Sequence, residues 1–412
     1  MTDIYVAGVA MTVFGRHLDR TVHDLARETL DKVVEDARCR IADIGVAFYS
    51  GVTQGYLQGQ VAIPGQVVFS KIGIDSIPIY NVESACASGS TAFHLAVQSL
   101  RAGGAEVALV LGAEKMNVLE KARAFSLFDA GCDVARADEY TQMLAKLSEG
   151  LQIPVGSEPN RPSSTFMAIA AGMARLHMKR YGTTQRQIAA VSAKNHRHAL
   201  QNPYAQIRKA FSVEEILAAP SVIYPLTLPM CAPLSDGAAA AILCSEAGLA
   251  RIAADRKRCV RVAASVLRSF GHRRLDQPEL HVARLAAQQA YDQAGLGPED
   301  MGVAEVHDAT AMGEIMQVEN LGFVPAGEGG PAAERGEFAL GGRLPVNPSG
   351  GLESKGHPLG ATGLGQVYEL TTQLRGEAGA RQVPGVRHAI QENDGGFQGI
   401  EEAAVTVHIL SR

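Results

Sequence analysis

The chain has 412 residues, of which 46% are hydrophobic and 20% are charged, so it can build a substantial core as two domains or one large duplicated domain. Only 5% of the residues are aromatic and there are 43 glycines, a mixture that suits a tightly packed α/β protein with many strand–helix turns. A formal net charge of -5 argues against general nucleic-acid binding. No run of about 18 apolar residues indicates a membrane span.

The cysteine pattern argues against metal and redox motifs. Six cysteines are scattered along the chain and none forms a CxxC pair, so neither a zinc knuckle nor a redox dithiol is indicated. The first residues show no basic segment followed by a hydrophobic run, so no secretory signal is expected. We therefore predict a cytoplasmic protein with reduced thiols and no metal ion.

The first half of the chain alternates short apolar runs with helical patterns. Strands are expected at 4–10, 44–49, 77–80, 106–112 and 236–243, and helices at 21–37, 60–72, 165–181 and 184–199. This βαβ rhythm predicts a mostly parallel sheet with helices on its faces.

Residues 117–163 interrupt this rhythm. They carry charges, Pro154, Pro159 and Pro162, and show little periodicity. A segment of this length in a compact protein is usually a lid, a binding insertion or an oligomer contact.

The second half repeats the rhythm, with strands at 259–266 and 303–306, helices at 280–294 and 361–375, and a final pair of strands flanking 393–399. We predict a duplicated α/β architecture. Its first half spans 1–250, including the insertion region at about 117–200, and its second half spans 251–412.

Cys86 lies where an apolar run gives way to a helical pattern. Amide groups and the positive end of a helix dipole lower the pKa of a thiol at such a turn. The same amides can hold an oxyanion when the sulfur attacks a carbonyl. A small buried residue that packs helix on sheet explains Cys86 equally well at this point.

Two histidines are candidate partners of this thiol. His357 stands in a glycine-rich turn that enters a helix, where it can act as the base of a nucleophilic cysteine or can simply bond to backbone. His307 ends a buried strand, the usual edge for ligands, and can donate to a thioester or enolate oxygen or be a satisfied strand-end histidine. Asp308 is expected to cap the helix that begins near Ala311.

Other motifs carry weaker signals. Residues 360–365 match neither a Walker loop nor a dinucleotide fingerprint, and helix packing explains their glycines better. His196 and His198 flank Arg197 on a polar helical segment and are expected to be solvated. Cys132 and Cys231 lack a context that would activate a thiol.

Taken together, four stretches resemble the thiolase superfamily, in particular its sterol-carrier-protein-2-type branch. SACASG at 84–89 resembles the nucleophilic-cysteine motif, and HDAT at 307–310 takes the place of that branch's His-Asp-Cys-Phe motif. GGLESKGHPLGATG at 350–363 is similar to the glycine-histidine-proline block, and GGFQG at 395–399 resembles the glycine-rich turn near the C-terminus.

The resemblance implies two similar α/β halves in five layers (αβαβα) and coenzyme A thioesters as substrates. Cys86 would attack the 3-oxo carbon of a 3-oxoacyl-CoA, and coenzyme A would then collect the acyl group from sulfur. His357 would activate Cys86 and polarise the thioester oxygen, with His307 as a second donor. The backbone amides of Cys86 and Gly395 would form the other oxyanion site.

One departure from the family matters for this mechanism. The second cysteine, which moves the proton at the α-carbon, is replaced by Asn393 in one motif and by Ala309 in the other. The proton must then come from His307, His357, Glu392, water or the substrate itself. Glu392 is a candidate for this role, although a salt bridge would explain it equally well.

Three functions stay open at this point. The first is cleavage or formation of a bulky, branched or aromatic 3-oxoacyl-CoA, for example of the benzoylsuccinyl-CoA kind, with segment 117–163 shaping the acyl pocket. The second is a retro-aldol lyase acting on a steroid-like acyl-CoA side chain, and the third is a non-catalytic subunit that binds acyl-CoA. The resemblance also implies a homodimer or tetramer, and some relatives work with a small zinc-containing OB-fold partner.

Overall fold

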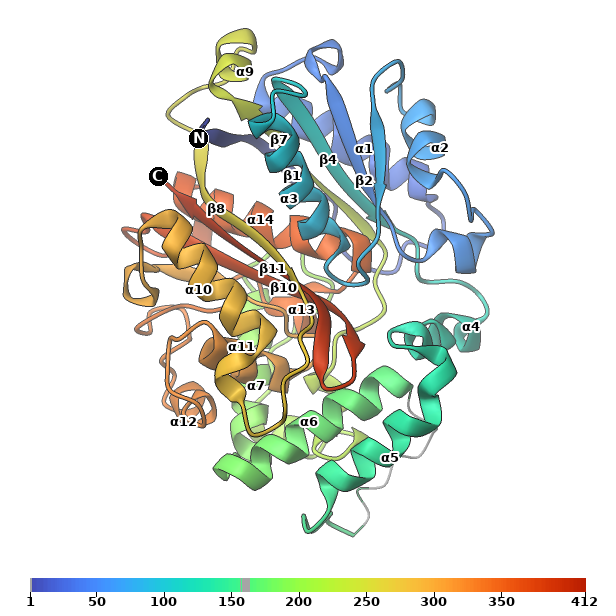
Figure 1. Cartoon of the computed structure of the whole chain (residues 1–412), viewed down its shortest axis with the longest axis vertical. Helices are drawn as coiled ribbons and strands as arrows, with labels where there is room; N and C mark the ends of the chain where they lie inside the picture. The colour runs from blue at the N-terminus through green and yellow to red at the C-terminus, as the bar shows by residue number, and fades with distance from the viewer. Residues whose placement is uncertain (1, 156, 158–163) are drawn as a thin grey trace.

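The computed structural model describes residues 2–155, 157 and 164–412 (Figure 1). Pro159 and Pro162 of the interrupting segment therefore lie outside the described residues. Among the described helices, none is long and apolar enough to cross a lipid bilayer.

Nine strands form one hydrogen-bonded sheet in the described chain, in the spatial order β3-β2-β4-β7-β1-β8-β11-β10-β9. The first five of these strands come from the first half of the chain, and the last four come from the second half. Their bounds are β3 (Ile79–Val82), β2 (Val46–Ser50), β4 (Val107–Glu114), β7 (Gly237–Ser245), β1 (Ile4–Met11), β8 (Val260–Ser269), β11 (Glu401–Ser411), β10 (His388–Gln398) and β9 (Val303–Glu305).

The sheet is mixed, so the expected mostly parallel sheet is wrong. Among the described strands, parallel pairing is confined to β3 with β2, β2 with β4, and β10 with β9. The strands between them pair antiparallel, from β4 through β7, β1, β8 and β11 to β10. The difference has a physical reason: an apolar run reads the same in either direction, so its letters do not fix strand orientation.

The two halves of this sheet lie on either side of a middle layer of helices, and the outer helices complete five layers. Helix α1, with α2, covers the outer face of the first-half strands, α3 and α14 fill the middle, and α10 and α11 cover the outer face of the second-half strands. The longer helices are α1 (Val22–Ala37), α2 (Pro64–Lys71), α3 (Ser88–Arg101), α5 (Ala137–Ser148), α6 (Thr165–Tyr181), α7 (Gln185–Ala199), α10 (Val282–Ala294), α11 (Ala311–Asn320) and α14 (Leu359–Arg375). The shorter ones are α4 (Lys121–Ser126), α8 (Val213–Leu217), α9 (Glu246–Arg251), α12 (Gly329–Glu334) and α13 (Gly351–Lys355).

Strand β1 shows how the sequence produces this layering. Its side chains alternate on either side of an irregularity between Val6 and Gly8, so that Val6 and Val9 both enter the middle core while Ala7 and Ala10 face α1. Both faces are buried, and the strand therefore reads as a continuous apolar run rather than as an alternation. The predicted α/β architecture is confirmed, whereas the boundary at 250/251 stays a prediction.

Helices α3 and α14 touch backbone to backbone at their N-terminal ends. A Cβ atom added to Gly89 of α3 would lie 2.8 Å from Gly360 O and 3.3 Å from Leu364 N, both of α14. A Cβ on Gly363 would in turn lie 2.6 Å from Asn393 Oδ1. The glycines at 360–365 thus serve helix packing, as the sequence predicted.

The segment after β4 leaves the layers. Helices α4, α5 and α6 lie together at one end of the sheet, away from the central α3 and α14 (Figure 1). The sequence expected a departure from the αβ rhythm here, and the described part of 117–163 confirms it.

We predict that Gly89→Ala lowers the free energy of unfolding by roughly 1–3 kcal/mol, because the new methyl group meets backbone atoms that cannot rotate away. Chemical denaturation monitored by circular dichroism measures this change. Gly271→Ala is the control, since nothing lies within 4 Å of its added Cβ. Equal unfolding free energies for Gly89→Ala and the unsubstituted protein would contradict the close approach of the two helices.

Candidate active site

Cys86 occupies a tight turn between β3 and α3. Ala85 has φ of +47°, which is unusual for a residue with a Cβ atom, and its N–H donates to Glu83 Oε1 at 2.6 Å. Ala87 N–H donates to Ser84 O at 3.0 Å and closes the turn. The thiol is 6% exposed and faces a cavity. Such strained backbone is tolerated where the surrounding contacts hold it in place.

His357 is a neutral base in this geometry. Thr362 Oγ1 donates its proton to Pro358 O at 3.1 Å, so it accepts from His357 Nδ1–H at 2.7 Å. This leaves the lone pair on Nε2, which has no partner among the described residues. Burial and the neighbouring His307 lower the pKa of His357 well below its usual value.

His307 is held in the opposite state. Its Nδ1 lies 2.6 Å from Asp394 Oδ1, and its Nε2 has no partner among the described residues. Burial lowers the pKa of His307, but the charge and hydrogen bond of Asp394, together with the charge of the nearby Cys86, outweigh burial and raise it well above its usual value. His307 is therefore a cation where His357 is not.

The structure brings together the three side chains that the sequence singled out. The sulfur of Cys86 and one nitrogen from each of His307 and His357 lie within 4.8 Å of one another, and the imidazole ring centroids are 5.2 Å apart. All three side chains are buried. A thiol between a neutral imidazole and an imidazolium can be deprotonated and can attack a carbonyl.

Two groups in the described chain have the atoms that a metal ion would need, but neither fits one. In the first, Cys86 with His307 and His357, the imidazolium of His307 has no lone pair to offer. In the second, His281 with Glu401 and Glu402, the guanidinium of Arg273 already pairs with Glu401. Both groups are better explained by proton and ion-pair chemistry.

Gly395 lies directly against the cysteine turn. A Cβ on Gly395 would lie 2.6 Å from Ala87 N and 3.0 Å from Cys86 N, so only glycine allows β10 to approach this closely. The glycine-rich motif lies largely inside β10 rather than in a turn between two strands, which corrects the expectation for 393–399.

Glu392 and Asn393 do not line the cavity that Cys86 faces. Glu392 Oε2 accepts from the backbone N–H of His307 at 3.0 Å, and Asn393 Oδ1 accepts from Ser90 Oγ at 2.7 Å. Burial and the charge of Asp394 raise the pKa of Glu392 well above its usual value. The geometry gives both residues a supporting position, and no salt bridge to Glu392 forms in the described chain.

The cavity in front of Cys86 has a volume of about 610 Å³ and a largely apolar wall. One side comes from the segment after β4, including Phe125 and Phe128, and the other from residues 228–234. Ala309 and His357 line this cavity together with the thiol. Coming from the layered core and from the interrupting segment, the lining comprises Arg16, Cys86, Met116, Asn117, Val118, Ala124, Phe125, Phe128, Ser164, Phe166, Met167, His196, Ile207, Phe211, Val222, Leu228, Pro229, Cys231, Ala232, Pro233, Leu234, Ala309, Glu353 and His357.

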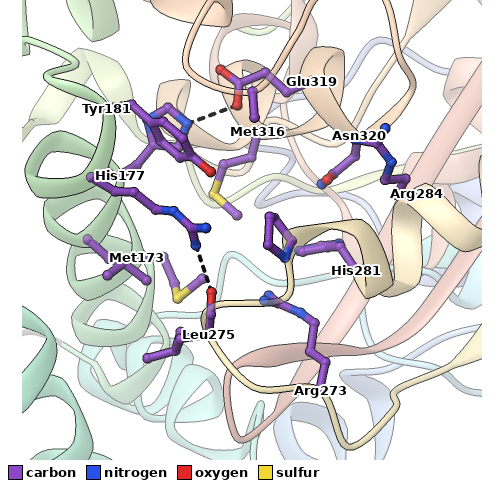
Figure 2. Close-up of a pocket in the computed structure, with 14 residues that line it drawn as sticks. Met173, His177, Tyr181, Arg273, Leu275, His281, Arg284, Met316, Glu319 and Asn320 are labelled. Atoms are coloured by element: carbon purple, nitrogen blue, oxygen red, sulfur yellow. Dashed lines mark hydrogen bonds and ion pairs between the residues drawn. The ribbon is translucent and has the colours of Figure 1, made fainter.

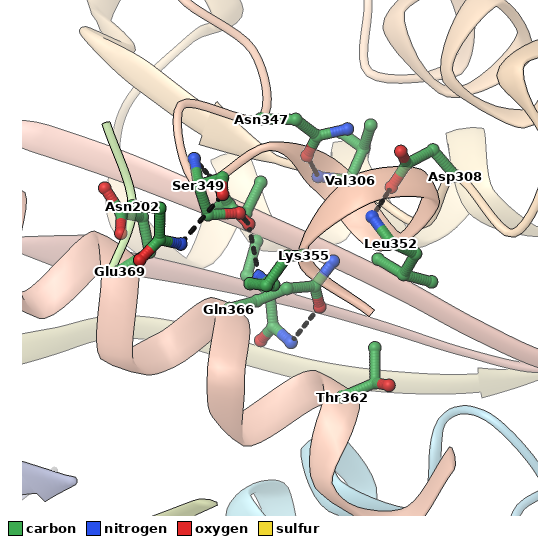
Figure 3. A network of polar contacts seen from close by, with 12 residues as sticks. Asn202, Val306, Asp308, Asn347, Ser349, Leu352, Lys355, Thr362, Gln366 and Glu369 are labelled. Atoms are coloured by element: carbon green, nitrogen blue, oxygen red, sulfur yellow. Dashed lines mark hydrogen bonds and ion pairs between the residues drawn. The ribbon is translucent and has the colours of Figure 1, made fainter. Parts of the chain in front are cut away.

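A buried polar network supports the turn that carries His357 (Figure 3). Lys355 Nζ lies 3.0 Å from Glu305 Oε2, and both side chains are completely buried. Ser349 donates to the same carboxylate through its backbone N–H at 3.0 Å and through its hydroxyl at 2.7 Å. Charge-assisted bonds in a low-dielectric interior fix this glycine-rich segment firmly.

Asp308 caps a different helix from the one expected. Its Oδ1 accepts from Leu352 N–H at 2.7 Å, in the first turn of α13, whereas Thr310 precedes α11 without a side-chain cap. Its Oδ2 accepts from Asn195 Nδ2, which also contacts carboxylate oxygens of Glu314 and Glu353. The sequence missed this cluster of carboxyl groups because its members are far apart in the chain.

His196 and His198 are buried, so the expectation of solvated side chains is wrong. His196 Nδ1 contacts Ser354 Oγ at 2.9 Å, and His198 Nδ1 contacts Asn347 O at 3.0 Å. Both histidines pack against the segment that precedes His357. The charged Arg197 between them is exposed, which made the whole segment look polar.

A second, smaller cavity of about 80 Å³ lies between α6, α10 and α11 (Figure 2). His177 of α6 contacts Glu319 of α11 at 3.0 Å, and the side chains of Met173, Met316 and His281 point toward the same space. His281, which lines this cavity, also contacts Glu402: its Nε2 lies 3.4 Å from Glu402 Oε2.

Comparison with known proteins identifies the family. Residues 4–217 match the family model "Thiolase, N-terminal domain", and residues 267–412 match "Thiolase C-terminal domain-like". An acetyl-CoA acetyltransferase of Methanothermobacter thermautotrophicus is 37% identical over the full length of both chains. Sterol carrier protein 2 of Homo sapiens is 37% identical over 95% of this chain and 70% of its own, and benzoylsuccinyl-CoA thiolase subunit BbsB of Thauera aromatica is 33% identical over 95% and 94%.

Solved structures agree on the fold. An aldolase described as Ltp2-ChsH2(DUF35) superposes with a TM-score of 0.77 and 21% identity over 99% of this chain and 97% of its own. Human mitochondrial 3-ketoacyl-CoA thiolase in complex with CoA superposes with a TM-score of 0.69 and 16% identity, over 100% of this chain and 98% of its own. The chain belongs to the thiolase family. It is an enzyme of the acyl-CoA acyltransferase class.

We predict that Asp308 makes the protein less stable as the pH rises from about 4 to 8. Burial and the charge of Glu314 raise the pKa of Asp308 to about 8, against about 3.9 when unfolded. The folded state therefore binds this proton more tightly, and its stabilisation is present below pH 4 and lost as the pH rises through 8. Asp308→Asn should flatten the stability profile over this range in denaturant titrations.

The exposed Asp19 supplies the control, since Asp19→Asn should leave the profile unchanged. An Asp308→Asn profile as steep as that of the unsubstituted protein would contradict a buried, protonated carboxyl at this position.

Proposed function

We propose that the enzyme cleaves or forms a 3-oxoacyl-CoA by Claisen chemistry, through an acyl group on Cys86. One observation supports this most strongly: the sulfur of Cys86 and one nitrogen of each imidazole lie within 4.8 Å of one another, and Cys86 and His357 line a largely apolar cavity. Retention of Cys86 in this setting disfavours the two alternatives, a retro-aldol lyase and a non-catalytic acyl-CoA-binding subunit, because neither needs a thiol nucleophile.

In the first half-reaction His357 Nε2 takes the proton of Cys86, and the sulfur attacks the 3-oxo carbon. The bond between C2 and C3 breaks, its electron pair passes to the departing thioester as an enolate, and the acyl group stays on sulfur. The amides of Cys86 and Gly395 hold the oxyanion of the adduct, each worth roughly 3–4 kcal/mol. In the second half-reaction coenzyme A takes the acyl group from Cys86.

The substrate is a bulky, branched or aromatic acyl group. A volume of about 610 Å³ is in the range of cavities that hold ligands of drug size, and an acetyl group would leave most of it unfilled. Aromatic walls from Phe125, Phe128, Phe166 and Phe211 suit an apolar or aromatic chain. One 33% identical relative is named for benzoylsuccinyl-CoA, which agrees with a substrate of this kind.

Coenzyme A is a substrate in this proposal, and no tightly bound cofactor is required. We propose that the protein is cytoplasmic, which its six unpaired cysteines support, and that it forms a homodimer or tetramer, as the family resemblance implies. A small zinc-containing OB-fold partner is a further proposal. The structural neighbour that carries a DUF35 component in its title supports it by analogy of fold alone.

The covalent step predicts a mass increase. Protein mixed with short, branched and aromatic acyl-CoAs should gain one acyl group by intact mass spectrometry, and Cys86→Ala should gain none. His357→Ala should fold but lose activity by about 100-fold to 10,000-fold, since it removes the base. Absence of any adduct on folded protein, with the partner protein present, would favour the lyase or binding-subunit alternatives.

The size of the acyl pocket can be tested separately. Ala232 lines the cavity, so Ala232→Phe should reduce kcat/KM for an aromatic acyl-CoA at least about tenfold, by overfilling the space, while acetyl transfer changes little. Ala253→Phe, at an exposed position, is the matched control. An equal loss for acetyl and aromatic substrates would contradict this cavity as the acyl site.

A further inference from the structure

The departing enolate needs a proton, and the residues at both positions of the family's second cysteine cannot give one. Ala309 has no proton to donate, and Asn393 bonds to Ser90 instead of facing the cavity. Ala309 lines the large cavity with Cys86, and it also lines an adjoining space of about 50 Å³ together with His307 and Asp394. His307 is thus the ionisable side chain beside the position that lacks the thiol.

Asp394 fixes both the orientation and the charge of His307. Its Oδ1 lies 2.6 Å from His307 Nδ1, and its Oδ2 accepts from Gln317 Nε2 of α11 at 3.1 Å. The carboxylate is thereby held from two sides, so Nδ1–H of His307 points at Asp394. The remaining Nε2–H is buried and has no partner among the described residues, and one nitrogen of the ring lies within 4.8 Å of Cys86 Sγ.

We propose that His307, held as an imidazolium by Asp394, replaces the missing cysteine as the acid that protonates the α-carbon. The inference rests on the proposed function and deepens it by naming this group. Asp394 is the positioning residue, because it touches His307 and not the substrate.

The protons balance over one turnover. His357 takes the proton of Cys86 when sulfur attacks, and His307 gives its Nε2 proton to C2 as the C2–C3 bond breaks. Coenzyme A then loses its thiol proton to neutral His307 and attacks the acyl carbon. Cys86 leaves as a thiolate and recovers its proton from His357, so no outside acid or base is consumed.

The two histidines divide the roles through their surroundings. His357 bonds Thr362 and pairs with no carboxylate in the described part of the chain, so it is neutral and acts as the base, whereas His307 faces an anion and carries the proton. Pairs of titratable groups whose environments drive their pKa values apart are typical of acid–base catalysis.

Other ionisable groups also face His307. Glu392 of β10 bonds its backbone N–H, and Glu402 of β11 lines the same small space. Burial and the charge of Asp394 raise the pKa of Glu402 to about 8, so Glu402 is largely uncharged at neutral pH. Asp394 is consequently the anion that holds the proton on His307.

Asp394→Asn tests the proposal through two separate half-reactions. Transfer of an acyl group from a simple acyl-CoA to Cys86 needs no carbon protonation, and coenzyme A can leave as a thiolate that takes its proton from His307 afterwards, so this half-reaction should fall by no more than about tenfold. Cleavage of a 3-oxoacyl-CoA should fall by about 100-fold to 10,000-fold, the usual contribution of a general acid. The basic limb of its pH–rate profile should move down by about 1–3 units, since an adjacent opposite charge shifts a pKa by that amount.

A second variant restores the missing thiol. Ala309→Cys combined with Asp394→Asn should recover at least tenfold of the lost cleavage, because a thiol at 309 would again donate to the α-carbon. Glu402→Gln is the matched control: it alters a neighbouring buried carboxyl that is already uncharged, so the cleavage rate at pH 7 should stay within about twofold.

The outcomes separate this proposal from the proposed function. Loss of cleavage with retained acylation, a shifted pH profile and rescue by Ala309→Cys would establish His307 as the acid. Unchanged cleavage and an unchanged profile in Asp394→Asn would overturn it while leaving the acyl-Cys86 mechanism intact. Failure of the unsubstituted protein to acylate would instead overturn the proposed function.

Discussion

The contact between α3 and α14 is the constraint on which the site depends. Cys86 precedes one of these helices and His357 the other, and each comes from a different half of the chain. The residues can meet only because Gly89 leaves room for the backbone of Gly360. Any side chain at this crossing would move the thiol away from its base. The glycines are therefore part of the catalytic geometry although they take part in no chemical step.

The charges of the two catalytic histidines also depend on very few residues. One carboxylate, Asp394, makes His307 cationic, while burial and the neighbouring charge of His307 keep His357 neutral. The same interior also holds carboxyl groups that stay protonated, such as Asp308 and Glu402, because burial disfavours their anions. Two histidines of different charge therefore lie in one buried centre, with their ring centroids 5.2 Å apart, because Asp394 pairs with one of them.

The sequence predicted the elements better than their arrangement. Regular apolar spacing located α1, α6, α7 and α14 closely, and the four motifs placed Cys86 and His357 at helix entrances. The strand directions were missed because an apolar run looks the same whichever way the strand points. His196 and His198 were misjudged because charged neighbours hide a buried helix face. Asp394 was missed as the partner of His307 because only folding brings β10 beside the end of β9.

The cavity wall and the catalytic centre come from different parts of the chain. Cys86, His307 and His357 sit on the layered core, where glycine contacts and the buried Lys355–Glu305 pair tolerate little change. Much of the surface that an acyl group would touch comes from the segment after β4 and from residues 228–234. Mutations can accumulate in these outer segments without disturbing the nucleophile. Acyl preference can therefore change through substitutions in the outer segments, whereas the catalytic chemistry depends on core residues that tolerate little change.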